Sequence, residues 1–196
     1  MARRVCARLL VLLPLLAAAK SYYFPEITTD VMLQADGSVR IVQERTYEFD
    51  GRFSWADLDL KKQGASDIRL NRLAMATDAG WQDIAPQELT SSDRSLYLRW
   101  GYSAEDEQRT FLIDYTVGGA VRRYEDVAEF YWKVIEDQHE PVGRITVRVI
   151  LPGSSPDLFK VYVHSAARPG ALTFARTLDT ANIEQGTALY PLEPGS

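Results

Sequence analysis

Residues 30–49 read DVMLQADGSVRIVQERTYEF and contain the clearest local signal of secondary structure in the chain. Two runs rich in β-branched and aromatic residues, 31–34 and 39–49, flank the dipeptide Asp36-Gly37. Because this dipeptide supplies the backbone freedom that a tight turn requires, the stretch predicts a β-hairpin. Alternate residues of the second run share a mainly apolar face, which is predicted to point inward: Val39, Ile41, Gln43, Arg45, Tyr47 and Phe49.

The same two-residue alternation recurs along the chain, at 95–102, 110–117, 143–152 and 158–165, with weaker runs at 171–178 and 186–192. In the first of these runs Trp100 shares a face with three other apolar residues, which predicts a core position rather than a ligand platform. Residues 66–76 fit either a strand with a slip in its alternation or a short helix. The polar composition of residues 77–95 and 101–108 predicts loops.

Long helical periodicity is nearly absent from the chain. About ten short strands separated by Gly, Pro, Asp and Ser turns predict an all-β fold, an antiparallel β-sandwich of the immunoglobulin-like kind with little helix. An open barrel is the alternative. No linker divides residues 20–196, so they are expected to form a single domain.

Residues 1–19 differ from the rest of the chain. Three arginines and no acid precede the apolar run LLVLLPLLAAA, and Ala17 and Ala19 stand three and one residues before Lys20. This pattern predicts a cleaved secretory signal peptide and therefore an exported, extracytoplasmic protein. An uncleaved anchor is the alternative, but the run is shorter than the roughly 20 residues that a membrane-spanning helix needs.

Charge and cysteine content exclude several classes of function. Loss of residues 1–19 removes three arginines, which shifts the formal net charge from −5 to −8 and disfavours nucleic-acid binding on electrostatic grounds. The single cysteine, Cys6, lies in the predicted signal peptide, so no disulfide or thiolate metal site is expected. The two histidines, His139 and His164, lie 25 positions apart and form no metal-ligand motif. We therefore expect no cofactor and no metal.

Catalytic signatures are also missing. The sequence has no nucleophile elbow, zinc-protease helix motif, phosphate-binding lysine loop or dinucleotide glycine pattern. Asp57 and Asp59 share one face of a predicted strand, where they could act as an acid/base pair or bind calcium, but an ordinary solvated face is the simpler interpretation. The expectation is a protein that is not an enzyme.

Residues 124–134, YEDVAEFYWKV, combine aromatic and acidic side chains. A strand over 128–135 separates apolar from polar residues best, and it places Phe130 and Trp132 inward. Tyr131 is then left outside. The candidate binding residues are Tyr124, Asp126, Glu129 and Tyr131, because tyrosines anchor protein partners and stack on sugars.

Three blocks of the sequence carry a family resemblance: ITTDVMLQADGSVRIVQERTYEFDGRFSWADLDL, FLIDYTVGGAVRRYEDVAEFYWKVI and PVGRITVRVILP. In this order they resemble the N-terminal extracytoplasmic region of a bacterial family of predicted membrane proteins, known as a domain of unknown function. The resemblance covers about residues 22–165. It implies a signal peptide, an exported β-rich domain and then transmembrane helices, which do not follow within this chain. It implies no catalytic residue, cofactor or substrate.

These observations together favour a non-enzymatic module that recognises or scaffolds an unknown protein or glycan at the cell envelope. Two alternatives remain open. One is a glycan hydrolase that uses surface carboxylates such as Asp57, Asp59 or Asp126. The other is a carbohydrate-binding module that uses Trp81, Tyr124 or Tyr131.

Overall fold

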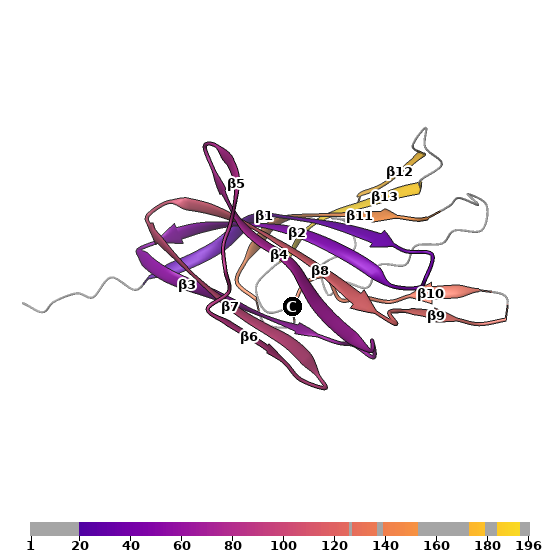
Figure 1. Ribbon diagram of the computed structural model, residues 1–196. Coiled ribbons are helices and arrows are strands. Elements are labelled where there is room, and N and C mark those ends of the chain that lie inside the picture. The colour runs from indigo at the N-terminus through magenta and orange to yellow at the C-terminus, as the bar shows by residue number, and fades with distance from the viewer. Residues whose placement is uncertain (1–19, 126, 137–138, 153–172, 179–183, 193–196) are drawn as a thin grey trace, which may run out of the picture.

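The computed structural model describes residues 20–125, 127–136, 139–152, 173–178 and 184–192, and these residues form thirteen strands and no helix (Figure 1). The strands are β1 (Ser21–Leu33), β2 (Val39–Asp50), β3 (Arg52–Lys61), β4 (Asp67–Thr77), β5 (Gly80–Asp83), β6 (Glu88–Ser91), β7 (Ser95–Glu105), β8 (Gln108–Gly118), β9 (Val121–Arg123), β10 (Ala128–Phe130), β11 (Val142–Ile150), β12 (Thr173–Leu178) and β13 (Glu184–Leu192). The predicted strand at 158–165, with His164, lies outside the described residues, as does the predicted signal peptide.

The strands form two facing sheets and a small hairpin (Figure 1). The larger sheet has the order β12-β13-β11-β1-β2-β8-β4-β5, the smaller sheet has the order β3-β7-β6, and β9 pairs with β10 alone. Neighbouring strands are antiparallel apart from β1 and β11, which run parallel. The all-β class is confirmed, whereas the immunoglobulin-like arrangement stays a prediction.

The hairpin predicted around Asp36-Gly37 joins β1 to β2. Gly37 has a φ of +84°, and the Asp36 carboxylate accepts a 2.9 Å hydrogen bond from the Ser38 amide across the turn. Only glycine adopts such a φ without strain, so the sequence sets the turn locally. The six β2 residues predicted to point inward are all buried, including the polar Gln43 and Arg45.

The core lies between the two sheets and is rich in aromatic rings. Trp100 of β7 is fully buried and meets Phe111 of β8 edge to face, with ring centroids 5.5 Å apart. Tyr47 of β2 contacts Phe111 in the same manner at 5.6 Å. Edge-to-face contacts are the favoured geometry for such pairs, and large aromatic side chains bury the most apolar surface. Trp100 is therefore a core residue, as the alternation predicts.

Two loop predictions are wrong. Residues 77–95 contain the short strands β5 and β6, and β6 pairs with β7 along a row of four exposed residues. Edge strands exposed on both faces lack the apolar alternation that reveals a strand. The strands β7 and β8 also extend through most of 101–108, because Tyr102 and Ala104 continue the inward face of β7 up to a tight turn at Asp106.

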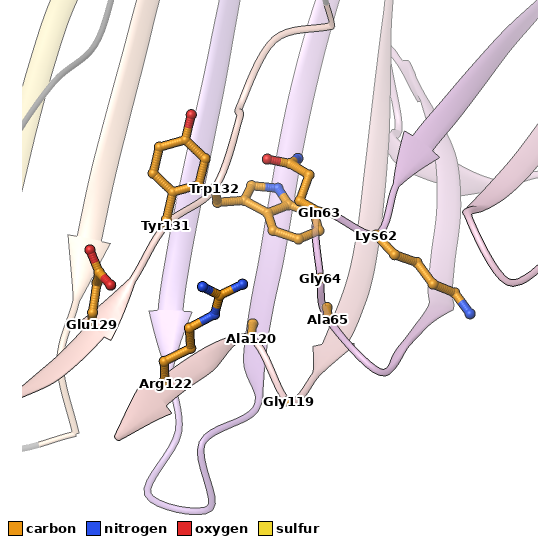
Figure 2. Close-up of a pocket in the computed structure, with 10 residues that line it drawn as sticks. All are labelled: Lys62, Gln63, Gly64, Ala65, Gly119, Ala120, Arg122, Glu129, Tyr131 and Trp132. Atoms are coloured by element: carbon orange, nitrogen blue, oxygen red, sulfur yellow. The ribbon is translucent and has the colours of Figure 1, made fainter. Parts of the chain in front are cut away.

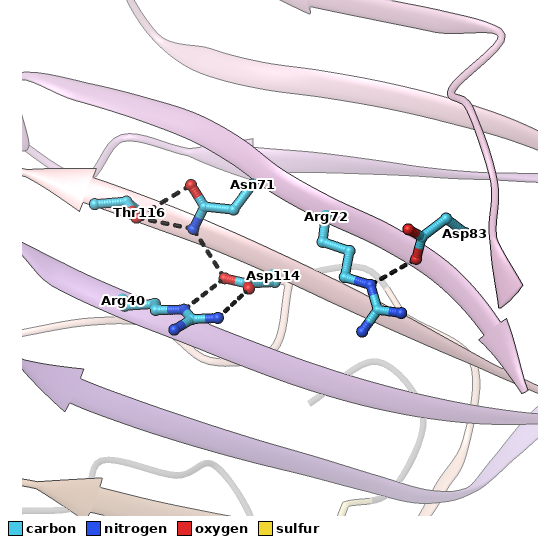
Figure 3. Close-up of polar contacts among 6 residues, drawn as sticks. All are labelled: Arg40, Asn71, Arg72, Asp83, Asp114 and Thr116. Carbon is cyan, nitrogen blue, oxygen red and sulfur yellow. Dashed lines mark hydrogen bonds and ion pairs between the residues drawn. The ribbon is translucent and has the colours of Figure 1, made fainter. Parts of the chain in front are cut away.

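The slip predicted within residues 66–76 is confirmed as an irregularity between Leu70 and Arg72, where β4 pairs with β8. Figure 3 shows the polar side chains that gather there on the outer face of the larger sheet. Asp114 of β8 is 4% exposed and accepts two hydrogen bonds from Arg40, at 3.0 and 2.6 Å. Asn71, the extra residue of β4, donates a third at 2.8 Å. Such a satisfied carboxylate fixes the position of three neighbouring strands.

Asp114 makes the stability of the fold depend on pH. Burial raises the pKa of its carboxyl group, but the hydrogen bonds from Arg40 and Asn71 together lower that pKa by more than burial raises it. The pKa therefore lies below the ordinary 3.8. A lowered pKa stabilises the fold above pH 3.8, and this stabilisation is lost as the pH falls through the folded-state value. The free-energy difference between the wild type and Asp114→Asn, measured by urea unfolding, is therefore expected to shrink below that pH. A difference that stays constant down to pH 2 would contradict this assignment.

Candidate binding pocket

The aromatic and acidic segment at residues 124–134 begins in the hairpin of β9 and β10. The strand β10 ends at Phe130, so the predicted extension of this strand to residue 135 is wrong. The alternation of side chains nevertheless continues: Phe130 and Trp132 pack against the core with their rings stacked 6.4 Å apart, while Tyr131 is 59% exposed. The inward placement of Phe130 and Trp132 is thus confirmed, although both stay partly exposed.

Side chains, rather than a neighbouring strand, hold the backbone of residues 131–136. The Lys133 amide donates a 2.8 Å hydrogen bond to the Gln63 side-chain oxygen, and the amide nitrogen of Gln63 donates in return to the Lys133 carbonyl at 3.4 Å. Gln43 of β2 donates to the Val134 carbonyl at 3.2 Å. These side-chain amides take the place of a strand partner, which explains why regular pairing stops at Phe130.

A buried cation fixes the far end of the same segment. Arg45 is 3% exposed, and its guanidinium donates to Gln43 at 2.7 Å and to the Glu136 carboxylate at 2.6 Å. Burial lowers the pKa of Arg45, but the charge and hydrogen bond of Glu136, together with the nearby Tyr47 and Tyr115, raise it by more, so the net shift of the pKa is upward. Gln43 in turn donates to the Thr29 hydroxyl at 3.1 Å. The network ties residues 134–136 to the two central strands of the larger sheet.

A pocket with a volume of about 150 Å³ lies where this segment meets two turns (Figure 2). The turn after β3, the connection from β8 to β9, and β10 with its continuation each contribute to it. The lining residues are Lys62, Gln63, Gly64, Ala65, Gly119, Ala120, Arg122, Glu129, Tyr131 and Trp132. The three segments are far apart in the sequence, so only the fold brings them together.

Arg122 is the central charged group of the pocket. Its side chain points from β9 toward Trp132 and the turn at Gly64 (Figure 2). A Cβ atom at Gly64 would lie 3.0 Å from the Arg122 Nη2 atom, and Gly64 has a φ of +92°. Glycine at this position therefore permits both the turn and the close approach of the guanidinium. Glu129 lies opposite Arg122 in the β9–β10 register.

The structure brings together part of the predicted site. Glu129 and Tyr131 line the pocket. Tyr124 does not line it; it is 54% exposed nearby, with its hydroxyl 3.4 Å from the Glu129 carboxylate. Asp126 lies outside the described residues. Sequence reasoning missed Arg122 and the turn at 62–65; the glycines at 64 and 119 marked turns but not their proximity.

The carboxylates considered for catalysis lie elsewhere, on the outer face of β3. Asp57 accepts a 3.1 Å hydrogen bond from the Tyr97 hydroxyl, and Asp59 contacts Lys61. Burial raises the pKa of Asp59, but its contacts with Lys61 and Ser95 lower it below the ordinary value. A general acid in glycoside hydrolysis needs a raised pKa, so this environment does not suit Asp59 to that role.

Within the part of the chain that the structure describes, no group of three histidine, cysteine or acidic residues could hold a metal ion. His139, in the polar segment before β11, contacts the Glu140 carbonyl at 2.7 Å. Likewise, no helix among the described residues is long and apolar enough to cross a membrane.

The fold and the pocket define the molecule as an all-β domain with a small, charged surface site. The chain belongs to the family described as the N-terminal domain of predicted membrane protein DUF2207, whose profile matches residues 24–189. The resemblance noted from the three sequence blocks is thereby confirmed. No curated protein matches the sequence.

Solved structures share the fold at low sequence identity. An M1 zinc metallopeptidase from Deinococcus radiodurans aligns with a TM-score of 0.51 and 13% identity, over 88% of this chain and 42% of the peptidase. Native yeast LTA4 hydrolase aligns with a TM-score of 0.50 and 10% identity, over 87% of this chain and 29% of the hydrolase. The chain thus spans less than half the length of these structures, and the likeness concerns the fold alone.

Proposed function

We propose that this domain is a non-enzymatic recognition or scaffolding module at the cell envelope, and that it binds a partner protein through the pocket beside the β9–β10 hairpin. The observation that carries the proposal is the pocket itself, a charged and aromatic site in which the segment after β10 is tied to β2 by Gln43 and to the turn after β3 by Gln63. The envelope location rests on the family's description as predicted membrane proteins and on the signal-peptide pattern of residues 1–19.

The surroundings of the pocket favour a protein partner. Tyr131, Tyr124 and Val127 are all more than half exposed on or beside the hairpin. Exposed aromatic side chains next to a charged arginine are typical of the residues that contribute most to protein–protein binding. The pocket volume of about 150 Å³ is smaller than the roughly 300 Å³ at which small-molecule sites begin. A single side chain of a larger partner fits this description better than a free metabolite.

The proposal can be tested in cells of the source organism with the full chain. A photo-crosslinking amino acid at position 131 is expected to yield one discrete protein adduct. The matched control is position 23, because Tyr23 is also an exposed aromatic, 42% exposed, at the opposite end of β2 from the pocket. The absence of an adduct at 131, or the same adducts at both positions, would contradict the proposal.

A carbohydrate-binding role is the second candidate, and one observation favours it. On the outer face of the smaller sheet, Trp55 is 46% exposed and lies under the Arg99 guanidinium, 4.1 Å from its ring centroid. Asp57 and Tyr97 lie beside this pair in the β3–β7 register. Glycan binding that is lost in Trp55→Ala but retained in Tyr131→Ala would favour this role over the first.

A further inference from the structure

An arginine side chain enters the pocket of a protein that is acidic overall (Figure 2). The chain carries a formal net charge of −5, and the pocket is lined by Lys62, Arg122 and a single acid, Glu129, but the Lys62 ammonium points away from Arg122 and contacts the Ser66 carbonyl (Figure 2). Although Glu129 lies opposite Arg122 in the hairpin register, the two form no ion pair, nor does Arg122 pair with any other carboxylate among the described residues. A guanidinium directed into a pocket without a counter-ion is a ready partner for an anion.

The size of the pocket limits the anion to a small group. A volume of about 150 Å³ cannot enclose a sugar ring together with its neighbours.

Two turns border the pocket through glycines with positive φ, Gly64 at +92° and Gly119 at +63°, and a Cβ atom at Gly119 would lie 3.1 Å from the Ser66 hydroxyl. The backbone of both turns therefore reaches the pocket without intervening side chains.

The charge balance separates a carboxylate from a phosphate. Arg122 and Glu129 are the charged groups nearest the pocket, because the Lys62 ammonium points away from it (Figure 2), so a bound anion has Glu129 as a neighbour. A phosphate group carries a charge of about −1.5 to −2 at neutral pH and would leave an excess of negative charge beside Glu129. The planar guanidinium of Arg122 also matches the two oxygens of a carboxylate.

We infer that the pocket binds the side-chain carboxylate of an Asp or Glu within an extended segment of the partner protein, with Arg122 as the main contact. The inference rests on the proposed function, because it names the group that the partner presents. A side chain is favoured over a chain terminus because the exposed Tyr131 and the Lys62 turn lie on two sides of the pocket. The backbone of a partner protein can therefore enter on the side of Tyr131 and leave on the side of the Lys62 turn.

The test uses three blocked peptides added to the ¹⁵N-labelled chain, with amide chemical shifts as the readout. The probes are Ac-Ala-Glu-Ala-NH₂, its glutamine counterpart Ac-Ala-Gln-Ala-NH₂, and Ac-Ala-Ala with a free terminal carboxylate. We expect the glutamate peptide to shift the amides of Gly64, Ala65 and Gly119 in a saturable manner, with an affinity at least about tenfold higher than that of the glutamine peptide. Arg122→Gln is expected to remove this difference.

Arg52→Gln is the matched control, because Arg52 is also exposed and the substitution changes the net charge equally. Equal shifts from the glutamate and glutamine peptides, or equal losses in the two variants, would overturn the inference. Binding of the terminal carboxylate alone would overturn the assignment to a side chain. If all three peptides fail while position 131 still crosslinks to one protein, the recognition role stands and the carboxylate assignment falls. A failure of the crosslink contradicts the recognition role, and the inference about the partner falls with it even if the glutamate peptide binds.

Discussion

Replacement of Trp100 with alanine is expected to lower the free energy of unfolding by about 3 to 5 kcal/mol. Trp100 is 0% exposed at the centre of the smaller sheet and contacts Phe111 across the core. The larger sheet fixes the opposite side of this site, so the cavity left by the indole can close only in part. Domains of this size are stable by about 5 to 15 kcal/mol, so the variant loses a large share of its stability. Urea unfolding followed by circular dichroism measures the loss.

Trp81→Ala is the matched control for this experiment. Trp81 lies on the short edge strand β5 and is 37% exposed. Its replacement is expected to change the free energy of unfolding by no more than about 0.5 kcal/mol, as for most surface substitutions. Similar unfolding midpoints for the two variants would show that Trp100 is not enclosed between the two sheets.

Replacement of Glu136 with alanine is expected to lower the free energy of unfolding by about 3 kcal/mol. The change leaves the Arg45 guanidinium buried without its counter-ion, and an uncompensated buried charge is strongly destabilising. The expected loss is at the lower end of the range for such pairs, because the Glu136 side chain is 27% exposed and water can enter once it is removed. Urea unfolding at neutral pH measures it.

The surface pair of Arg52 and Glu105 provides the comparison, since both of its side chains are well exposed. Glu105→Ala is expected to cost less than about 1 kcal/mol. A second substitution, Arg45→Met in the Glu136→Ala background, is expected to restore part of the stability, because an apolar side chain of similar length often replaces a buried pair without loss. Equal effects of Glu136→Ala and Glu105→Ala would mean that Arg45 is reached by solvent.

The sequence predicts those parts of the fold in which alternation alone determines burial. In β2 the residues placed inward by alternation are all buried, and in β7 and β8 they are buried apart from the half-buried Tyr102. On β8 the outward residues Leu112 and Asp114 are buried as well, which alternation does not predict. The turn at Gly37 is likewise local, because its conformation depends on the φ of a single residue. The parallel pairing of β1 with β11 could not be predicted in this way, since the two strands are far apart in the sequence.

Polar residues account for most of the wrong or missing predictions. Alternation places Arg45 on the inner face of β2, but its partner Glu136 is 91 positions away and carries no pattern of its own. The strands β5 and β6 are polar because the edges of the sheets face solvent, and so they read as loops. In both cases the deciding interaction is long-range, and a local pattern contains no trace of it.

The candidate site shows the same limit. Glu129 and Tyr131 could be chosen from one short aromatic and acidic stretch. Arg122 lies only a few residues before that stretch, but its role depends on the turn at Gly64, which meets it only in the folded chain. The pocket is assembled from three segments that are separate in the sequence. Its residues can be recognised as one site only when the order of the strands in the sheets is known.

The pocket can bind a partner as proposed only if the segment after β10 is a fixed wall rather than a loose connection. Amide hydrogen exchange at Lys133 tests this directly, because that amide donates to the Gln63 side chain and not to a strand. We expect the Lys133 amide to be protected in the wild type and to lose its protection in Gln63→Ala, while the amides of β2 remain protected in both. Exchange of the wild-type Lys133 amide at the rate of an unfolded peptide would contradict it.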